Sequence, residues 1–152
     1  MTLDILEEMR KVVSALDEGA VDYALVGAFA LAIHGAPRAT TDIDLLIRPE
    51  DVDRALSLVA PLGFSLPAQP MTFPSGVTVQ RVSKVDADEL LTLDLLLATG
   101  PLTEAWESRM SVDALGIRLR VVDRAQLVRM KALAGRLRDL ADIERLRGDD
   151  DA

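Results

Sequence analysis

The stretch that most constrains the fold runs from Tyr23 to Ile47, YALVGAFALAIHGAPRATTDIDLLI. It joins an apolar strand, a turn at Gly27, a short apolar helix and a second strand that carries Asp42 and Asp44. Successive side chains on a strand point to opposite faces, so Asp42 and Asp44 should project together while Ile43 points the other way. The sequence therefore predicts a strand–turn–helix–strand unit with two carboxylates on one face.

A third acid, Asp94, interrupts the apolar segment LLTLDLLLA, which predicts a central strand buried on both faces. Two carboxylates about 4 Å apart repel by roughly 4 kcal/mol at an effective dielectric near 20, and a third carboxylate adds to this repulsion. If the acids meet, protonation, a basic side chain or a divalent cation must offset it. Oxygen ligands in a chain with no Cys and one His favour Mg²⁺ or Mn²⁺ over zinc.

These residues carry a resemblance to a known superfamily. The pattern consists of Gly27-Ala28, Gly35, Arg38, Thr40 or Thr41, Asp42 and Asp44, followed by Asp94. It resembles the nucleotidyltransferase superfamily that includes DNA polymerase beta. Downstream, LVRMKALAGRLRDLADIERL is similar to the closing helical segment of the minimal abortive-infection-type (AbiEii-like) members, with Lys131, Arg136 and Asp139 at matching positions.

The resemblance implies a nucleotidyltransferase fold and a magnesium-dependent activity. The enzyme would move a nucleoside monophosphate from an NTP to an acceptor hydroxyl on RNA, protein or a small molecule, with release of pyrophosphate. The implied catalytic residues, which are also the metal ligands, are Asp42, Asp44 and Asp94, with Asp94 nearest the acceptor. The residues implied to bind the triphosphate are Gly27, Ala28, Arg38, Thr41 and Lys131.

Several of these residues have an ordinary structural alternative. Asp42 could form local hydrogen bonds in a turn after Thr40 and Thr41, and Asp94 could sit at a solvent-facing strand end. Arg38 could neutralise the acids or hold its loop, and Lys131 could pair with a carboxylate on a helix. For Arg136 and Asp139, three residues apart, we favour an intrahelical ion pair. We expect the only histidine, His34, to pack at a helix end.

Ala28 departs from the superfamily pattern, in which the turn is usually Gly-Gly or Gly-Ser. Alanine keeps the small size but loses the hydroxyl, while backbone N–H groups at a helix start still attract phosphate oxygens. This departure favours a second hypothesis, a non-catalytic interaction protein such as one component of a toxin–antitoxin pair, whose partner would be a small helical protein. A metal-dependent hydrolase ranks last because the sequence offers no candidate histidine to activate water.

Length and composition are typical of one globular domain spanning residues 1–152, with a C-terminal helical segment at about 124–147. The start, MTLDILEEMRKVV, is too acidic for a signal peptide, and no segment approaches the roughly 20 apolar residues that span a bilayer. The absence of cysteine is compatible with the cytoplasm, and we expect a cytoplasmic protein with no membrane partner. The net charge of −8 argues against nucleic-acid binding, although nine Lys and Arg residues gather between Arg118 and Arg147.

Hydrophobic periodicity predicts an α/β (α+β) fold, a mixed sheet flanked by helices. We expect helices at 3–18, 29–34, 49–59 and 124–146, the last broken near Gly135. We expect strands at 22–26, 43–47, 77–82 and 90–97, and two short strands about Gly116 within 111–122. Residues 61–74, with Gly63, Pro67 and Pro70, predict irregular structure.

Overall fold

The computed structural model describes residues 3–151, apart from the side chains at 137 and 149–151. The first element, α1 (Ile5–Glu18), is the amphipathic helix expected over residues 3–18. Asp4 caps it by accepting hydrogen bonds from the backbone N–H groups of Leu6 and Glu7, and it ends at Gly19. Its buried face packs into the core.

Within the described residues, eight strands form one mixed sheet in the order β3-β5-β6-β2-β1-β8-β7, with β4 beside β5. The β2–β6 and β1–β8 pairs are parallel, and the remaining pairs are antiparallel. The strands are β1 (Ala24–Val26), β2 (Asp42–Ile47), β3 (Leu66–Pro67), β4 (Met71–Thr72), β5 (Thr78–Asp86), β6 (Glu89–Leu97), β7 (Met110–Ala114) and β8 (Ile117–Val121). The predicted mixed sheet is confirmed.

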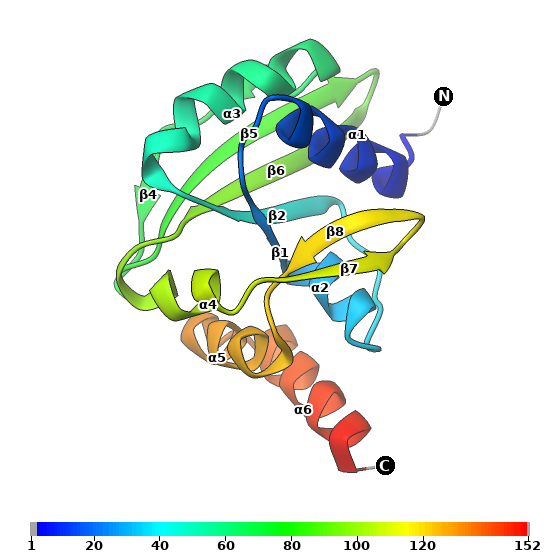
Figure 1. The fold of residues 1–152 in the computed structure, drawn as a ribbon, viewed down its shortest axis with the longest axis vertical. Helices are drawn as coiled ribbons and strands as arrows, with labels where there is room; N and C mark the ends of the chain where they lie inside the picture. Colours follow the sequence, from blue (N-terminus) through cyan, green and yellow to red (C-terminus); the bar gives the residue numbers. More distant parts are fainter. Residues whose placement is uncertain (1–2, 152) are drawn as a thin grey trace.

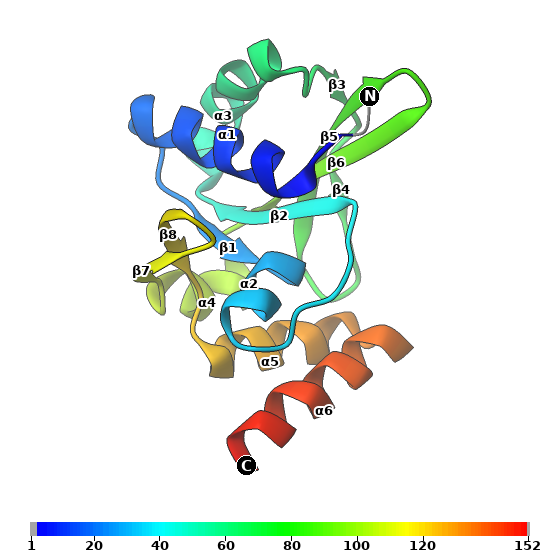
Figure 2. The ribbon, with the colours of Figure 1, turned by 90° about the vertical axis from the view of Figure 1, so that its right-hand side faces the viewer.

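Helices cover the sheet on two opposite sides. Figures 1 and 2 both show α1 and α3 on one side of β2 and α5 and α6 on the other. The further helices are α2 (Gly27–Ile33), α3 (Val52–Val59), α4 (Thr103–Glu107), α5 (Arg124–Ala134) and α6 (Leu137–Asp151), with 3₁₀ turns at Pro49–Asp51, Ala60–Leu62 and Gly100–Leu102. Between residues 3 and 151, no helix has the length and hydrophobicity needed to cross a bilayer.

Apolar side chains of the two central strands build the core. Leu45, Leu46 and Ile47 of β2 and Leu93 and Leu95 of β6 are buried. The apolar run that predicted a central strand therefore lies between β5 and β2, in the interior of the sheet. The acids of both strands are held on this rigid platform.

The predicted elements differ from the structure mainly at their ends. β5 continues to Asp86 rather than ending at Val82, and β1 begins at Ala24 rather than Asp22. The helical segment does break at Gly135, which caps α5 in the left-handed conformation. Residues 61–74 contain a 3₁₀ turn and the two-residue strands β3 and β4, and α4 was not predicted.

Candidate active site

The turn between β1 and α2 brings the backbone of Gly27 against the carboxylate of Asp44. Val26 pairs with Asp44 across the β1–β2 ladder, and Gly27 follows with a φ of +65°. A Cβ atom added at Gly27 would lie 2.1 Å from Oδ2 of Asp44. Only glycine allows both this left-handed conformation and this close approach. The Asp44 carboxylate thus occupies the space that a side chain at position 27 would fill.

The parallel pair β2–β6 places Asp44 and Asp94 side by side. Asp44 is in register with Asp94, and Asp42 is in register with Thr92. Residues in register on neighbouring strands project from the same face, so the three acids share one face of the sheet. Burial, reinforced by the charges of Asp94 and Asp42, raises the pKa of the Asp44 carboxyl to about 7. Asp44 is therefore a carboxyl whose charged form is disfavoured by its surroundings.

Asp42 is held by threonine hydroxyl groups. The hydroxyl of Thr92 on β6 donates a hydrogen bond of 2.5 Å to Oδ1 of Asp42, and that of Thr41 donates one of 3.4 Å to the same oxygen. The backbone N–H of Asp42 donates to the hydroxyl of Thr40 over 3.0 Å. The local hydrogen bonds of the ordinary alternative are therefore present, and Asp42 still lies on the face of Asp44.

Asp94 is paired with Arg81 of β5, which stands opposite it in the β5–β6 ladder. Nε and Nη2 of Arg81 donate hydrogen bonds of 2.8 and 3.0 Å to the two carboxylate oxygens. Among the described side chains, no three His, Cys, Asp or Glu residues lie close enough together to hold a metal ion. The three acids share a face, but they do not form a ready-made three-carboxylate metal site, and Arg81 engages Asp94.

A buried ionic cluster joins α5 to α6 beside the acids. Nζ of Lys131 lies 3.4 Å from Oδ1 of Asp139 and 3.3 Å from Oδ2 of Asp142, and all three side chains are buried. Arg136 donates from Nε to Oδ2 of Asp139 over 2.6 Å. Burial alone would raise the pKa of Asp139, but the Arg136 hydrogen bond and the Lys131 charge outweigh it and lower that pKa. The expected ion pair of Arg136 and Asp139 is confirmed.

Arg38 reaches the same cluster from the loop that precedes β2. Its Nε lies 3.3 Å from Oδ2 of Asp142. Within the described residues, both of these buried atoms lack a hydrogen bond, although their charges are close. Arg38 therefore connects its loop to α6 by charge attraction and keeps one buried donor free.

Two pockets meet at the acids. The small pocket, of about 160 Å³, is lined by Gly27 and Thr40, by five basic residues (Arg38, Arg81, Lys131, Arg136 and Arg138) and by the carboxylates of Asp42, Asp44, Asp94 and Asp139. The large pocket, of about 680 Å³, extends toward β4 and β5 and includes Met71, Phe73 and Val79. Both pockets share a wall that contains Asp44, Asp94, Arg81 and Arg136. One end of the site is thus densely charged, with one more basic than acidic residue, and the other is mainly apolar.

Ala28, Thr41 and His34 lie outside the linings of these two pockets. Ala28 is buried in α2, and the exposed Thr41 contacts Asp42, while neighbouring Thr40 lines the small pocket. His34 caps α2, and its Nε2 lies 2.8 Å from the carbonyl oxygen of Val122, so it packs at a helix end as expected. Of the triphosphate candidates, Gly27, Arg38 and Lys131 come together at the small pocket.

Sequence reasoning missed Arg81, Thr92, Arg138 and Asp142. The signal for Arg81 lies in the register of the β5–β6 hairpin, in which Asp86 pairs with Glu89 across the two-residue turn Ala87-Asp88. Counting back five residues from Asp86 and on five from Glu89 places Arg81 opposite Asp94. The turn contains no glycine or asparagine, so it gives no strong hairpin signal.

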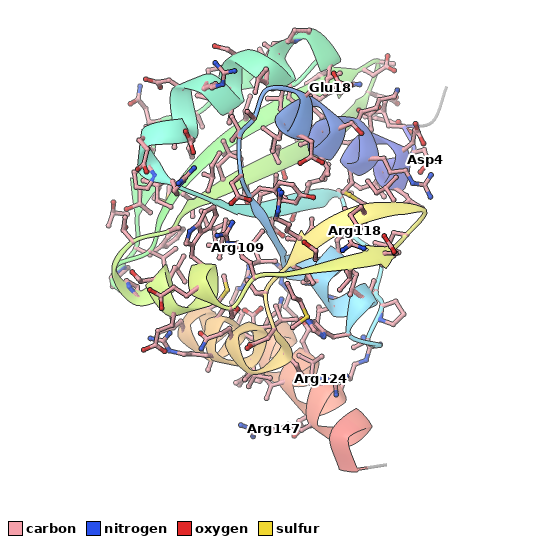
Figure 3. The ribbon with its side chains drawn as sticks, in the orientation of Figure 1. Asp4, Glu18, Arg109, Arg118, Arg124 and Arg147 are labelled. Carbon is pink, nitrogen blue, oxygen red and sulfur yellow. The ribbon has the colours of Figure 1, made fainter. Side chains whose placement is uncertain are left out.

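The basic residues between Arg118 and Arg147 do not form a single surface. Figure 3 shows Arg118 on the β7–β8 hairpin and Arg147 far from it, near the end of α6. Arg118 pairs with Asp113 across the hairpin, and Lys131 is buried in the ionic cluster. This distribution agrees with the expectation of mixed-charge surfaces rather than a nucleic-acid groove.

No protein-family model and no curated protein sequence matches this chain. Solved structures do match its fold. A Thermotoga maritima protein (TM1012) assigned as a nucleotidyltransferase superposes with a TM-score of 0.68 at 13% identity, covering 95% of this chain and 93% of that one. The antibiotic-resistance factor ANT(2″)-Ia gives a TM-score of 0.66 at 17% identity, covering 97% and 84%.

A third structure has the same architecture. The lincosamide antibiotic adenylyltransferase LnuA, bound to lincomycin, gives a TM-score of 0.63 at 12% identity, covering 93% of this chain and 95% of that one. ANT(2″)-Ia has also been solved in complex with adenylyl-2″-tobramycin. At identities this low, the superpositions show a shared fold alone. The expected nucleotidyltransferase fold is therefore confirmed.

Proposed function

We propose that this chain, which shares the fold of the nucleotidyltransferases, transfers a nucleoside monophosphate from an NTP to an acceptor hydroxyl. The observation that carries the proposal is the register of Asp44 with Asp94 on parallel strands, with the Gly27 turn and a cationic pocket alongside. This arrangement combines acids for a reacting phosphoryl group with positive charge for its leaving group. The nucleotidyltransferases of the same fold support it.

The small pocket is the proposed site of the triphosphate. Arg38 and Lys131 line it and supply positive charge. Thr40 adds a hydroxyl near the Gly27 turn, where the α2 backbone begins. Thr40 would thus supply a hydroxyl group beside the triphosphate, in place of the serine hydroxyl that Ala28 lacks.

The chemistry of the acids fits Mg²⁺ or Mn²⁺, because carboxylate oxygens are the ligands that these ions prefer. Asp42 and Asp44 would hold the metal, and Asp94 would join them after leaving Arg81. The raised pKa of Asp44 fits this assignment, since a bound cation would offset both the burial and the repulsion that disfavour its charged form. When bound, the metal supplies charge stabilisation for the phosphoryl oxygens.

The reaction is a substitution at the α-phosphorus. The acceptor oxygen forms a bond to this phosphorus, and the bond from it to the oxygen that bridges to the β-phosphorus breaks, so that pyrophosphate leaves. We assign Asp94 as the base that takes the hydroxyl proton. Arg81 is about half exposed, so its side chain has room to swing away from Asp94.

The test is incubation with each α-³²P-labelled NTP and Mg²⁺ in cell extract. We expect label to move to an acceptor, and we expect Asp44→Asn and Asp94→Asn to reduce this by about 100-fold or more. Asp86→Asn is the control, because Asp86 is an exposed acid at the end of β5 in the same sheet. A folded protein that binds no NTP and labels nothing would contradict the proposal.

The alternative function is a non-catalytic interaction protein, such as one half of a toxin–antitoxin pair. The bidentate Arg81–Asp94 pair favours it, because Arg81 compensates the charge of an acid that would otherwise be available for a metal. Copurification with a small helical protein, together with no label transfer from any NTP, would support this alternative.

A further inference from the structure

The large pocket is walled mainly by apolar side chains from three parts of the fold. Met71 and Phe73 come from β4 and the loop after it, Leu96 comes from β6, and Met130 and Leu133 come from α5. Its volume of about 680 Å³ lies within the range of roughly 300–1,000 Å³ that is typical of small-molecule sites. Such a pocket gains binding energy by removing apolar ligand surface from water.

Three of the four charged residues that line this pocket are already paired. Its charged lining residues are Asp44, Asp94, Arg81 and Arg136; the two arginines are each paired with a carboxylate, namely Asp94 and Asp139. Apart from Asp44 and Asp94, the described lining contains no carboxylate. A ligand with several ammonium groups would find at most Asp44 and the Arg81-paired Asp94 there, so its other ammonium groups would lose their hydration without gaining an ionic partner, which is unfavourable.

The position of the pocket fits it to the acceptor. In an in-line displacement, the attacking oxygen and the leaving group lie on opposite sides of the phosphorus. The small pocket contains the basic residues proposed to hold pyrophosphate, and the large pocket adjoins it at Asp44 and Asp94. An attacking hydroxyl therefore enters from the large pocket.

We propose that the acceptor is a small molecule with a mainly apolar body and a reactive hydroxyl, and without a cluster of ammonium groups. The proposal rests on the proposed function and specifies its substrate class. The hydroxyl oxygen of this molecule forms the bond to the α-phosphorus while pyrophosphate leaves, and the proton passes to Asp94. Phe73 and Leu133 then act as specificity-determining residues.

The first test measures binding without nucleotide or metal. Two uncharged probes, 2-(2-naphthyloxy)ethanol and 4-biphenylmethanol, and the polyamine tobramycin are titrated against the full chain by isothermal calorimetry at the same ionic strength. We expect at least one aryl alcohol to bind about tenfold or more tightly than tobramycin, because its desolvation favours the apolar pocket. Tighter binding of tobramycin than of both alcohols overturns the proposal.

A matched pair of variants locates the binding. Leu133 on α5 lines the pocket and is 37% exposed, whereas Leu140 on α6 lies outside its lining and is 49% exposed. We expect Leu133→Asp to weaken the aryl alcohol by about tenfold and to strengthen tobramycin, since it adds a carboxylate to the pocket. Leu140→Asp should change neither affinity. Equal effects of the two variants overturn the location.

Label transfer separates this proposal from the function on which it rests. If the aryl alcohols bind as expected and no NTP is bound or used, the transferase proposal fails while the apolar ligand site stands. If label moves to tobramycin or to RNA in the extract, the transferase proposal stands and the apolar acceptor is wrong. Labelling of an aryl alcohol, lost in Leu133→Asp and kept in Leu140→Asp, supports both.

Discussion

At the scale of single residues, the contact between Gly27 and Asp44 sets the geometry of the site. The Asp44 carboxylate lies where a side chain at Gly27 would be, and the backbone there is left-handed. The orientation of the acid therefore depends on a neighbour with no side chain. Burial is also the largest cause of the raised Asp44 pKa.

We predict that Gly27→Ala displaces Asp44 and removes transferase activity. The new Cβ would stand 2.1 Å from Oδ2 of Asp44, and the φ of +65° adds strain of roughly 1–2 kcal/mol. Gly100→Ala separates the two effects, because Gly100 has a φ of +53° but open space around it. Thermal melts should show a larger loss for Gly27→Ala, and equal losses in the two variants would contradict the contact.

We predict that, without metal, Asp44→Asn is more stable than wild type and that this difference grows as pH rises. The folded-state pKa of about 7 exceeds the ordinary 3.8, so the stability associated with this group is fully present below pH 3.8 and is lost as pH rises through 7. Each pKa unit corresponds to about 1.4 kcal/mol, so asparagine should gain at most about 4 kcal/mol over wild type by pH 8. Melts in EDTA from pH 5 to 8 test this, and a pH-independent difference would disprove it.

At the scale of elements, the predicted strands were those whose apolar pattern is continuous. β2 and β6 are fully apolar apart from their acids and Thr92, so burial on both faces fixes their identity. β3 and β4 have two exposed residues each and exist only through pairing with β5, which local sequence does not encode. Their absence from the prediction reflects tertiary pairing that overrides local propensity.

The candidate site was predictable to the same extent. The shared face of Asp42 and Asp44 follows from strand alternation, and their pairing with β6 follows from the resemblance rather than from spacing. Arg81 was not predicted because its contact with Asp94 depends on the register of the β5–β6 hairpin. The turn Ala87-Asp88 sets that register with Ala87 at a φ of +58°, and it has no glycine to mark it in the sequence. Lys131 was identified, but the Asp142 that it contacts lies on another helix and needed the three-dimensional fold.

For the α5–α6 pair, we predict that Lys131→Met is strongly destabilising. It would leave Asp142 buried without Lys131 and remove one partner of Asp139, at a cost of about 3 kcal/mol. Arg129→Met on the same helix breaks an exposed pair with Glu104 and an exposed hydrogen bond to Gln126, and should cost about 0.5 kcal/mol or less. Urea unfolding compares the two, and similar midpoints would show that the buried cluster is not stabilising.

At the scale of the whole molecule, helices on both sides of the mixed sheet hold the two pockets against its central strands. The chain carries a net charge of −8, so divalent cations could affect its stability through general screening as well as through one site. These contributions can be separated, because screening depends on ionic strength and a bound ion depends on particular acids.

We predict that Mn²⁺ raises the melting temperature of the whole chain through Asp44. At a concentration of ten times the dissociation constant, binding contributes about 1.4 kcal/mol, or about 3–5 °C for a chain of this size. The gain should disappear in EDTA and in Asp44→Asn, and should persist in Asp86→Asn. An equal rise with NaCl at matched ionic strength would show that screening alone is responsible.

The segment Leu66–Gly76, which contains β3 and β4, is attached to the sheet only through β5. It contributes Met71 and Phe73 to the large pocket and none of the three acids. Grafting a different segment at this position would therefore alter selectivity while leaving the catalytic platform intact. Proteins of this architecture could therefore acquire new acceptor preferences by changing one surface segment, while the acids on the central strands stay in place.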